Sequence, residues 1–333
     1  MKKIILMALC VVLCVSCFTG CSQKTEEPIV DEVVTPVIEE EVKNIEEQEV
    51  VEEEKEAEAE EEDLLKDLDE EIFKRIDGST ATIPISESLA LEILGEDADM
   101  SVVKHNRTSM AYERLINGEV DLIFVTPPSE EEQKMLEQSK NGENSTSFDL
   151  EKFAKEGFVF LVNKNNKVES LSVEEIQNIY KNDITNWKDI GGEDANIKPY
   201  QRPENSGSQT LMYKLVAPKE DISGKATIEI VESMMGLVEA VANYEGGKDS
   251  IGYSVYYYIN DMIDLGESKL LKINGVLPSV ETIKDGSYPL VDGYYMIYNA
   301  NLDPEDDIYK VINYLRSEKG QKMIEEAGYV PVN

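Results

Sequence analysis

From about residue 72 to the C-terminus, short apolar runs alternate with amphipathic segments of helical periodicity. The runs at 120–125 and 158–163 predict buried strands, and the segments at 235–242 and 308–317 predict helices. Alternation of this kind over about 260 residues is typical of an α/β fold, in which helices flank mostly parallel sheets. We therefore expect the folded part of the chain to be an α/β domain.

The same patterns place the remaining elements. Further strands are expected at 73–76, 101–104, 250–258, 270–273 and 294–298. Further helices are expected at 85–94, 110–117, 173–180 and 320–327. Ser172 and Glu175 have the spacing of a capping box, which predicts where the helix at 173–180 begins.

The first 20 residues have the pattern of a targeting signal, with two lysines, an apolar stretch at 4–15 and then small residues. All four cysteines lie within the first 21 residues, so the rest of the chain has no thiol for a disulfide or a cysteine metal site. Residues 18–21, Phe-Thr-Gly-Cys, resemble a bacterial lipobox, in which Cys21 would carry the lipid. A plain secretory signal that is cut nearby is the alternative.

Residues 22–71 contain 23 acidic and 4 basic side chains and no aromatic residue. Such a composition cannot bury enough apolar surface to offset the entropy of ordering. We therefore expect 21–71 to be the lipidated cysteine and a disordered acidic linker, and 72–333 to be the folded domain. The formal net charge of the whole chain is −36, which argues against nucleic acid as a partner.

Three segments with hydroxyl side chains, 79–83, 108–109 and 206–208, each lead into an expected helix. A helix start leaves several backbone N–H groups free, with the positive end of the helix dipole behind them. Gly207 allows a ligand to approach the backbone closely, and Arg202 precedes it with a planar fork of donors. Because ligands of α/β folds bind where strands end and helices begin, these segments predict a site for a small oxyanion.

Several stretches carry a resemblance to a known family: Asp77-Gly78-Ser79-Thr80-Ala81-Thr82-Ile83-Pro84, 184–192, 202–210, Ile251-Gly252-Tyr253 and 320–331. Through them, residues 73–333 resemble the phosphate-binding lipoproteins of bacterial phosphate ABC importers, in the type II periplasmic-binding-protein superfamily. The resemblance implies two α/β lobes that are joined by two crossover strands and close on a dehydrated anion. Lobe 1 would comprise about 72–157 and 292–333, and lobe 2 about 158–291.

The resemblance also implies which residues hold the anion. Thr82 and Ile83 would donate a hydroxyl and backbone N–H groups from the first loop. Arg202 would donate its guanidinium fork, and Glu204 would orient it through a salt bridge. The other ligand-binding residues would be Ser79, Thr80, Thr108 or Ser109, Ser206, Gly207 and Ser208.

At one position the sequence departs from the family pattern. Thr126 stands where the family commonly has an aspartate, which accepts a proton from the bound anion. Thr126 could accept through the lone pairs of its hydroxyl, or Asp77 or Asp292 could supply the acceptor instead. Phosphate remains the expected ligand, but we expect sulfate to be excluded less strictly than in relatives that have the aspartate.

The resemblance further implies that the protein is a monomer that binds inorganic phosphate and uses no cofactor or metal. Its other partners would be the permease and ATPase subunits of an importer, and the membrane, to which the lipid would attach it. Another oxyanion such as sulfate is an alternative ligand, and a surface adhesin or sensor without an importer is an alternative role. A hydrolase would need Ser109 or Ser206 as nucleophile with a base. Because the only histidine, His105, lies close to two basic residues, an enzyme is not expected.

Overall fold

The computed structural model describes residues 64–140, 145–222, 224, 229–243 and 249–333, all within one compact unit. The predicted targeting segment 1–20, the predicted lipidation site Cys21 and most of the predicted linker lie outside the described residues. None of the helices in the described ranges has the length and apolar character needed to cross a bilayer.

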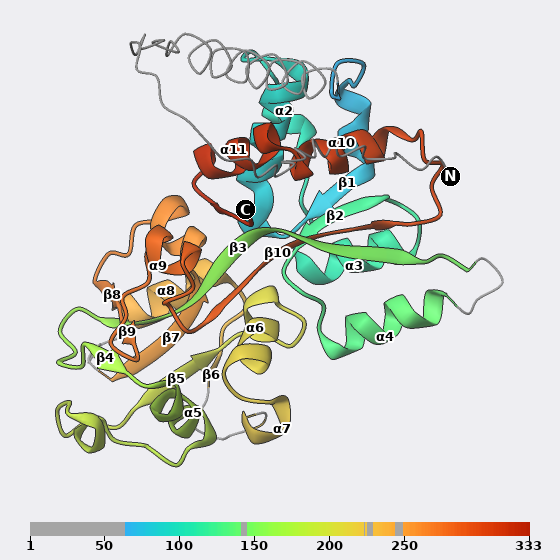
Figure 1. The fold of residues 1–333 in the computed structure, drawn as a ribbon. Coiled ribbons are helices and arrows are strands. Elements are labelled where there is room, and N and C mark those ends of the chain that lie inside the picture. The colour runs from blue at the N-terminus through green and yellow to red at the C-terminus, as the bar shows by residue number, and fades with distance from the viewer. Residues whose placement is uncertain (1–63, 141–144, 223, 225–228, 244–248) are drawn as a thin grey trace, which may run out of the picture. The chain divides into compact units, whose positions relative to one another are not determined.

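Strands and helices alternate along the chain (Figure 1). The strands are β1 (Ile76–Gly78), β2 (Leu122–Val125), β3 (Phe148–Asn163), β4 (Ser170–Leu171), β5 (Lys198–Gln201), β6 (Glu229–Ile230), β7 (Ser250–Val255), β8 (Ser268–Leu270), β9 (Lys272–Ile273), β10 (Val291–Asn299) and β11 (Val330–Pro331). The α-helices are α2 (Ile83–Leu94), α3 (Thr108–Ile116), α4 (Glu130–Ser139), α5 (Val173–Lys181), α6 (Gly207–Leu215), α7 (Lys219–Ile222), α8 (Met234–Asn243), α9 (Val280–Lys284), α10 (Asp307–Arg316) and α11 (Glu318–Glu326). The short helical turns are η1 (Glu70–Arg75), η2 (Thr80–Thr82), η3 (Met100–Val102), η4 (Trp187–Ile190) and η5 (Tyr258–Met262).

Most strands form one sheet, in the order β1-β2-β10-β3-β7-β5-β6. Parallel pairs lie at its two ends, β1 with β2 and β5 with both β6 and β7, whereas β3 and β10 run antiparallel to their neighbours between them. We call β1, β2 and helices α2 to α4 the β1 side, and β5 to β7 with helices α5 to α8 the β6 side. The predicted α/β fold class is confirmed.

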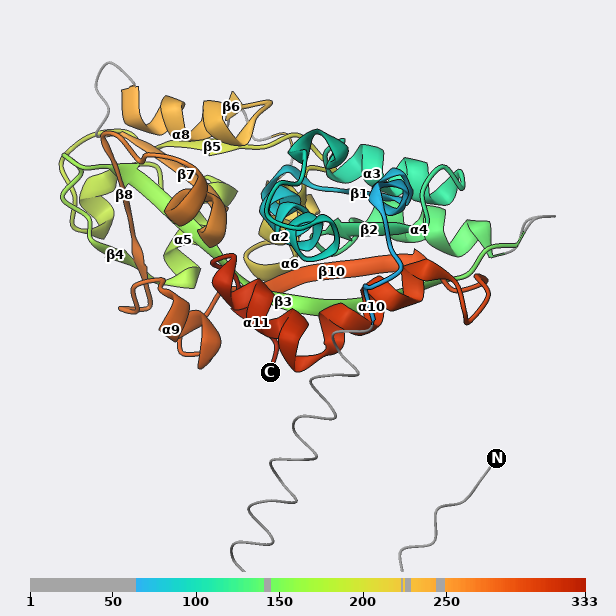
Figure 2. The same ribbon diagram turned by 90° about the horizontal axis from the view of Figure 1, so that it is seen from above.

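Strand β3 belongs to both sides of the sheet. Its residues 148–157 pair with β10, and its residues 158–162 pair with β7, so the partner changes between Gly157 and Phe158. Both views show β3 and β10 running next to each other between the two sides, with α10 and α11 alongside (Figures 1 and 2). The prediction of a strand at 158–163 therefore covered only the second part of β3.

Buried side chains lie on both faces of the sheet. All four residues of β2 are buried: Leu122 and Phe124 belong to the main core, and Ile123 and Val125 to a second cluster with side chains of α3 and α4. Because successive side chains of a strand point to opposite faces, this division means that both faces of β2 are covered.

The start of the folded domain was placed too late in the chain. Leu65 and Leu68 are buried in the main core together with Ile72, although they lie in the predicted linker. Their spacing of three and four residues makes one apolar stripe in an acidic segment, which overall composition does not reveal. The strand predicted at 73–76 is also wrong, because residues 70–75 form η1, capped by the Asp69 side chain, and β1 follows it.

Other predictions vary in outcome. The strand predicted at 101–104 is wrong, because the Asp99 side chain accepts from Ser101 N and caps the turn η3 there. The capping box at α5 is confirmed, with 3.1 Å from Glu175 N to Ser172 Oγ and 2.7 Å from Ser172 N to Glu175 Oε2. The strand expected at 250–258 ends at Val255, and the one expected at 270–273 is divided between β8 and β9.

Candidate anion-binding site

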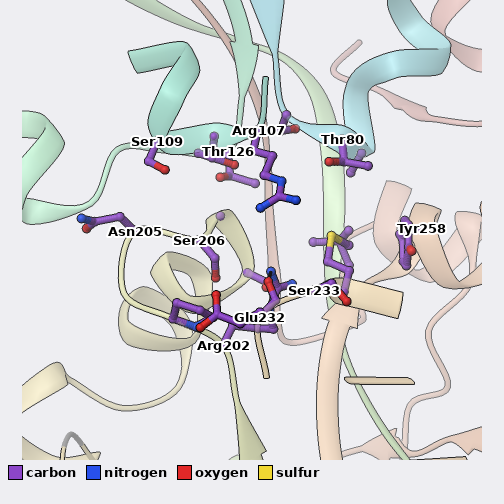
Figure 3. Close-up of a pocket in the computed structure, with 18 of the residues that line it drawn as sticks. Thr80, Arg107, Ser109, Thr126, Arg202, Asn205, Ser206, Glu232, Ser233 and Tyr258 are labelled. Atoms are coloured by element: carbon purple, nitrogen blue, oxygen red, sulfur yellow. Dashed lines mark hydrogen bonds between the residues drawn. The ribbon is translucent and has the colours of Figure 1, made fainter. Parts of the chain in front are cut away.

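Loops from both sides of the sheet surround a pocket of about 360 Å³. The β1 side contributes the loop after β1, the start of α3 and Thr126 after β2, and the β6 side contributes the loop after β5 and the start of α8 (Figure 3). Among the predicted ligand residues, the pocket is lined by Ser79, Thr80, Thr108, Ser109, Thr126, Arg202, Ser206, Gly207 and Ser208. Thr82 and Ile83 do not line it.

The start of α6 lies close to the β1 side. Ser206 is the N-cap, and its hydroxyl accepts from Gln209 N at 3.3 Å. A Cβ added to Gly207 would overlap Thr126 Oγ1 and would lie 3.1 Å from Thr108 Oγ1. Glycine is therefore required here by the close approach of the two sides. The first turn of α6, where backbone N–H groups have no partner within the helix, lines the pocket.

Arg202 is held rigidly in the wall of the pocket with 9% of its surface exposed. Its Nε donates to Val231 O and its Nη2 to Glu232 O, both at 2.9 Å. Burial lowers the pKa of Arg202, and the positive charge of Arg107 lowers it further. The guanidinium is thus oriented by backbone carbonyls.

The predicted role of Glu204 is wrong. Its carboxylate accepts from Lys219 Nζ at 2.7 Å, and the donors of Arg202 are directed to carbonyl groups that follow β6. The two side chains flank Pro203, and a turn begins at Glu204. Lys219 reaches Glu204 from α7, a contact between distant residues that local spacing does not predict.

Three buried polar atoms at the pocket lack a hydrogen-bond partner among the described residues: Arg202 Nη1, Thr126 Oγ1 and Ser208 Oγ. An unpaired buried donor costs roughly 1–3 kcal/mol, so such groups are found mainly where a ligand or water satisfies them. One is a permanent cationic donor and two are hydroxyls, which suit the oxygens of an oxyanion.

In the first loop, Thr82 has a structural role. It is fully buried, and its hydroxyl donates to Phe124 O at 2.8 Å and lies 3.0 Å from Ser79 O. Ile83 is the first residue of α2. The short turn η2 instead brings Ser79, Thr80 and Ala81 to the pocket. The sequence motif predicted a loop that reaches the pocket but not which of its residues line it.

His105 supports this loop from behind. Its Nδ1 lies 2.9 Å from Ser79 O and its Nε2 lies 3.0 Å from Ser86 Oγ. Burial lowers the pKa of His105, which favours the neutral ring. Both ring nitrogens are therefore engaged away from Ser109 and Ser206, so neither serine is paired with the base that a hydrolase would need.

The two aspartates suggested as proton acceptors are engaged elsewhere. Asp77 accepts from Arg114 Nη1 at 2.5 Å and from Asn106 N at 2.7 Å. Asp292 pairs with Lys152 at 3.1 Å and Lys214 at 2.6 Å. Burial alone would raise the pKa of Asp292, but the two lysines hold it below its ordinary value. Neither aspartate lines the pocket.

Other pocket residues were not predicted: Ala81, Arg107, Pro203, Glu204 as a lining residue, Asn205, Glu232, Ser233, Met234, Met235, Val255 and Tyr258. Arg107 directly precedes the predicted helix start at Thr108 and Ser109, so its position next to a candidate anion site was a usable signal. The segment 232–235 reaches the pocket only because β6 pairs with β5, which the sequence does not indicate.

The chain was compared with known proteins. The family model described as "PBP superfamily domain" matches residues 27–319. The phosphate-binding protein PstS of Staphylococcus haemolyticus is 29% identical over 266 residues, covering 76% of this chain and 79% of the relative. The phosphate-binding protein PstS of Staphylococcus aureus strain USA300 is 27% identical over 262 residues, covering 76% of each chain.

Solved structures share the fold. A phosphate ABC transporter substrate-binding protein with bound phosphate from Clostridium perfringens has a TM-score of 0.61 at 23% identity, covering 78% of this chain and 98% of that one. An ABC-type phosphate transport receptor from Vibrio cholerae has a TM-score of 0.57 at 23% identity, covering 77% and 98%. At this identity the similarity establishes the architecture.

Proposed function

Because the chain belongs to the periplasmic-binding-protein (PBP) superfamily, we propose that it is the extracellular substrate-binding component of an ABC importer and that it binds inorganic phosphate. The observation that carries the proposal is the group of unpaired buried donors at the pocket, Arg202 Nη1, Ser208 Oγ and Thr126 Oγ1. The names of the relatives, phosphate-binding proteins, agree with this ligand.

In this proposal the β1 side belongs to one lobe, residues 64–157 with 292–333, and the β6 side belongs to the other, residues 158–291. Strands β3 and β10 link them, and phosphate is bound between the loop at Ser79 and the start of α6. Phosphate would be delivered to permease and ATPase subunits in the membrane, where a lipid on Cys21 keeps the protein. The role is binding and transfer of a ligand rather than catalysis.

The test is calorimetric titration of the purified protein with phosphate. Arg202→Lys should lose about 1.5–3 kcal/mol of binding free energy, because a lysine cannot keep both carbonyl contacts and still donate to the ligand. Glu204→Gln is the matched control and should bind nearly as well as wild type, since Glu204 pairs with Lys219. Binding of phosphate by Arg202→Ala with unchanged affinity would exclude this pocket.

A further inference from the structure

Arg107 brings a second guanidinium to the pocket. It lines the cavity from the start of α3, and in Figure 3 its side chain extends from the β1 side toward Arg202 and Ser206. Its side chain makes no hydrogen bond or ion pair with any residue in the described part of the chain. The lowering of the pKa of Arg202 by the Arg107 charge agrees with their proximity.

Two carboxylates line the same pocket, and the charge of Glu232 raises the pKa of Arg202. Glu204 is paired with Lys219, and Glu232 is exposed at the rim. No buried carboxylate is found among the described residues that line the cavity. The ligand oxygens therefore meet two guanidinium groups, hydroxyls and helix N–H groups, and a proton on the ligand finds no strong acceptor.

Resting on the proposed phosphate-binding function, we propose that Arg107 is a specificity-determining residue that contacts the bound anion, and that the site takes phosphate as its dianion. Each proton that phosphate retains has only neutral hydroxyl oxygens to accept it inside the cavity, and these are weaker partners than a buried carboxylate. Each proton that it loses adds charge to interact with two guanidinium groups. The same site should accept sulfate, which has the same shape and no proton.

As the pH falls, titration of protein groups near the pocket should strengthen anion binding, whereas protonation of the phosphate should weaken it. These groups are Glu204 and Glu232 at the rim, His105 behind the first loop, and Tyr258, whose pKa is raised above its ordinary value by burial. Any proton that the protein takes up as the pH falls makes the surroundings of the pocket more positive, which should strengthen anion binding. A loss of phosphate affinity at low pH therefore reports the ligand's own proton.

The test is calorimetry with phosphate and with sulfate from about pH 5 to about pH 8, a range that spans the second ionisation of a phosphate group. At pH values below the second pKa of phosphate, phosphate affinity should rise about tenfold for each unit of increase in pH, because one proton is lost on binding. Sulfate affinity should stay constant or weaken slightly over the same range. Arg107→Gly removes a charge that attracts the dianion more strongly than the monoanion, so it should weaken phosphate binding about 10- to 100-fold at the high-pH end and, as the variant then admits the monoanion, less at the low-pH end. Lys104→Ala, which removes an exposed charge outside the pocket, should leave both profiles unchanged.

Three results would overturn the proposal. Phosphate affinity that is independent of pH means that a protein group accepts the ligand's proton. Failure of sulfate to bind where phosphate binds means that the site requires that proton. A pH profile that Arg107→Gly leaves unchanged removes the role of Arg107. If neither anion binds at any pH, the proposed function itself fails.

Discussion

At the scale of single residues, Arg107 has backbone angles of φ 71° and ψ 163°. This region is essentially restricted to glycine and costs about 1–3 kcal/mol for other residues. Strain of this kind persists where the surrounding structure imposes it, and here it places a charged side chain at the pocket. The strained backbone at Arg107 therefore lowers the stability of the fold while it places one guanidinium at the pocket.

Arg107→Gly should make the ligand-free protein more stable by about 1–3 kcal/mol, because glycine adopts these angles without strain. Urea denaturation without phosphate measures the change. Asn182→Gly is the matched control: Asn182 also has positive φ, at 69°, but lies in the left-handed helical region that asparagine tolerates. Its effect should be a few tenths of a kcal/mol. An Arg107→Gly protein that is less stable than wild type would contradict this explanation.

Gly207 offers a second test at this scale. Gly207→Ala places a methyl group against Thr126 Oγ1, so the start of α6 has to move away from the β1 side. We expect phosphate affinity to fall more than about tenfold, since several helix N–H donors move with it, while thermal stability changes little. Adding Thr126→Ala removes the overlap and should restore part of the affinity. Wild-type binding by Gly207→Ala alone would show that this close contact is not needed.

Much of the site could be predicted from local chemistry, because hydroxyl residues before an amphipathic segment mark a helix start wherever it lies. What could not be predicted depends on distant residues. The Thr82 side chain is directed away from the pocket because its hydroxyl donates a hydrogen bond to Phe124 O of β2. The Glu204 carboxylate accepts from Lys219 instead of Arg202. Arg202 is oriented by Val231 O and Glu232 O, which arrive through the pairing of β5 with β6.

At the scale of elements, β3 carries a buried carboxylate where it changes partner. Glu156 Oε1 accepts from Gly157 N at 2.8 Å and from Tyr257 N at 3.2 Å. Burial raises the pKa of Glu156 from its ordinary value of 4.5 to about 7. The folded protein thus retains this proton at pH values where the unfolded chain has lost it.

This difference predicts a pH dependence of stability. The contribution is fully present below about pH 4.5 and is lost as the pH rises to about 7, by up to about 3 kcal/mol. Glu156→Gln mimics the protonated form, so it should be more stable than wild type at about pH 8 and similar at about pH 4.5. Thermal melts at both pH values measure this. Asp149→Asn, at an exposed site on the same strand, is the matched control, and a change in stability for Glu156→Gln that is the same at both pH values would contradict the assignment.

The elements best predicted from sequence have signals that do not depend on their neighbours. The α5 capping box is such a signal. Helix α4 has the same box at Ser129 and Glu132. It was not predicted, because its glutamate-rich sequence has too few apolar residues to show a helical period. The first part of β3, from Phe148, was missed because its buried and exposed residues do not alternate regularly, and its strand character depends on pairing with β10.

At the scale of the whole molecule, the proposed anchor determines where the binding domain works. Cys21→Ser should leave the precursor unprocessed or release the protein into the medium, because the acidic linker offers no attraction to a membrane surface. Membrane fractionation and the mass of the mature protein measure the outcome, with Cys17→Ser as the matched control. Unchanged fractionation and mass for Cys21→Ser would rule out this anchor.

The position of β10 in the sheet has a consequence for how the protein is made. Synthesis reaches β1, β2 and β3 long before β10, the strand that lies between β2 and β3. Until β10 emerges from the ribosome, β2 and β3 each present an open edge of unpaired backbone groups, to which other nascent chains can pair. A polypeptide that stops before residue 291 cannot close this gap at all. The growing chain therefore stays open to aggregation at this part of the sheet until β10 has been made.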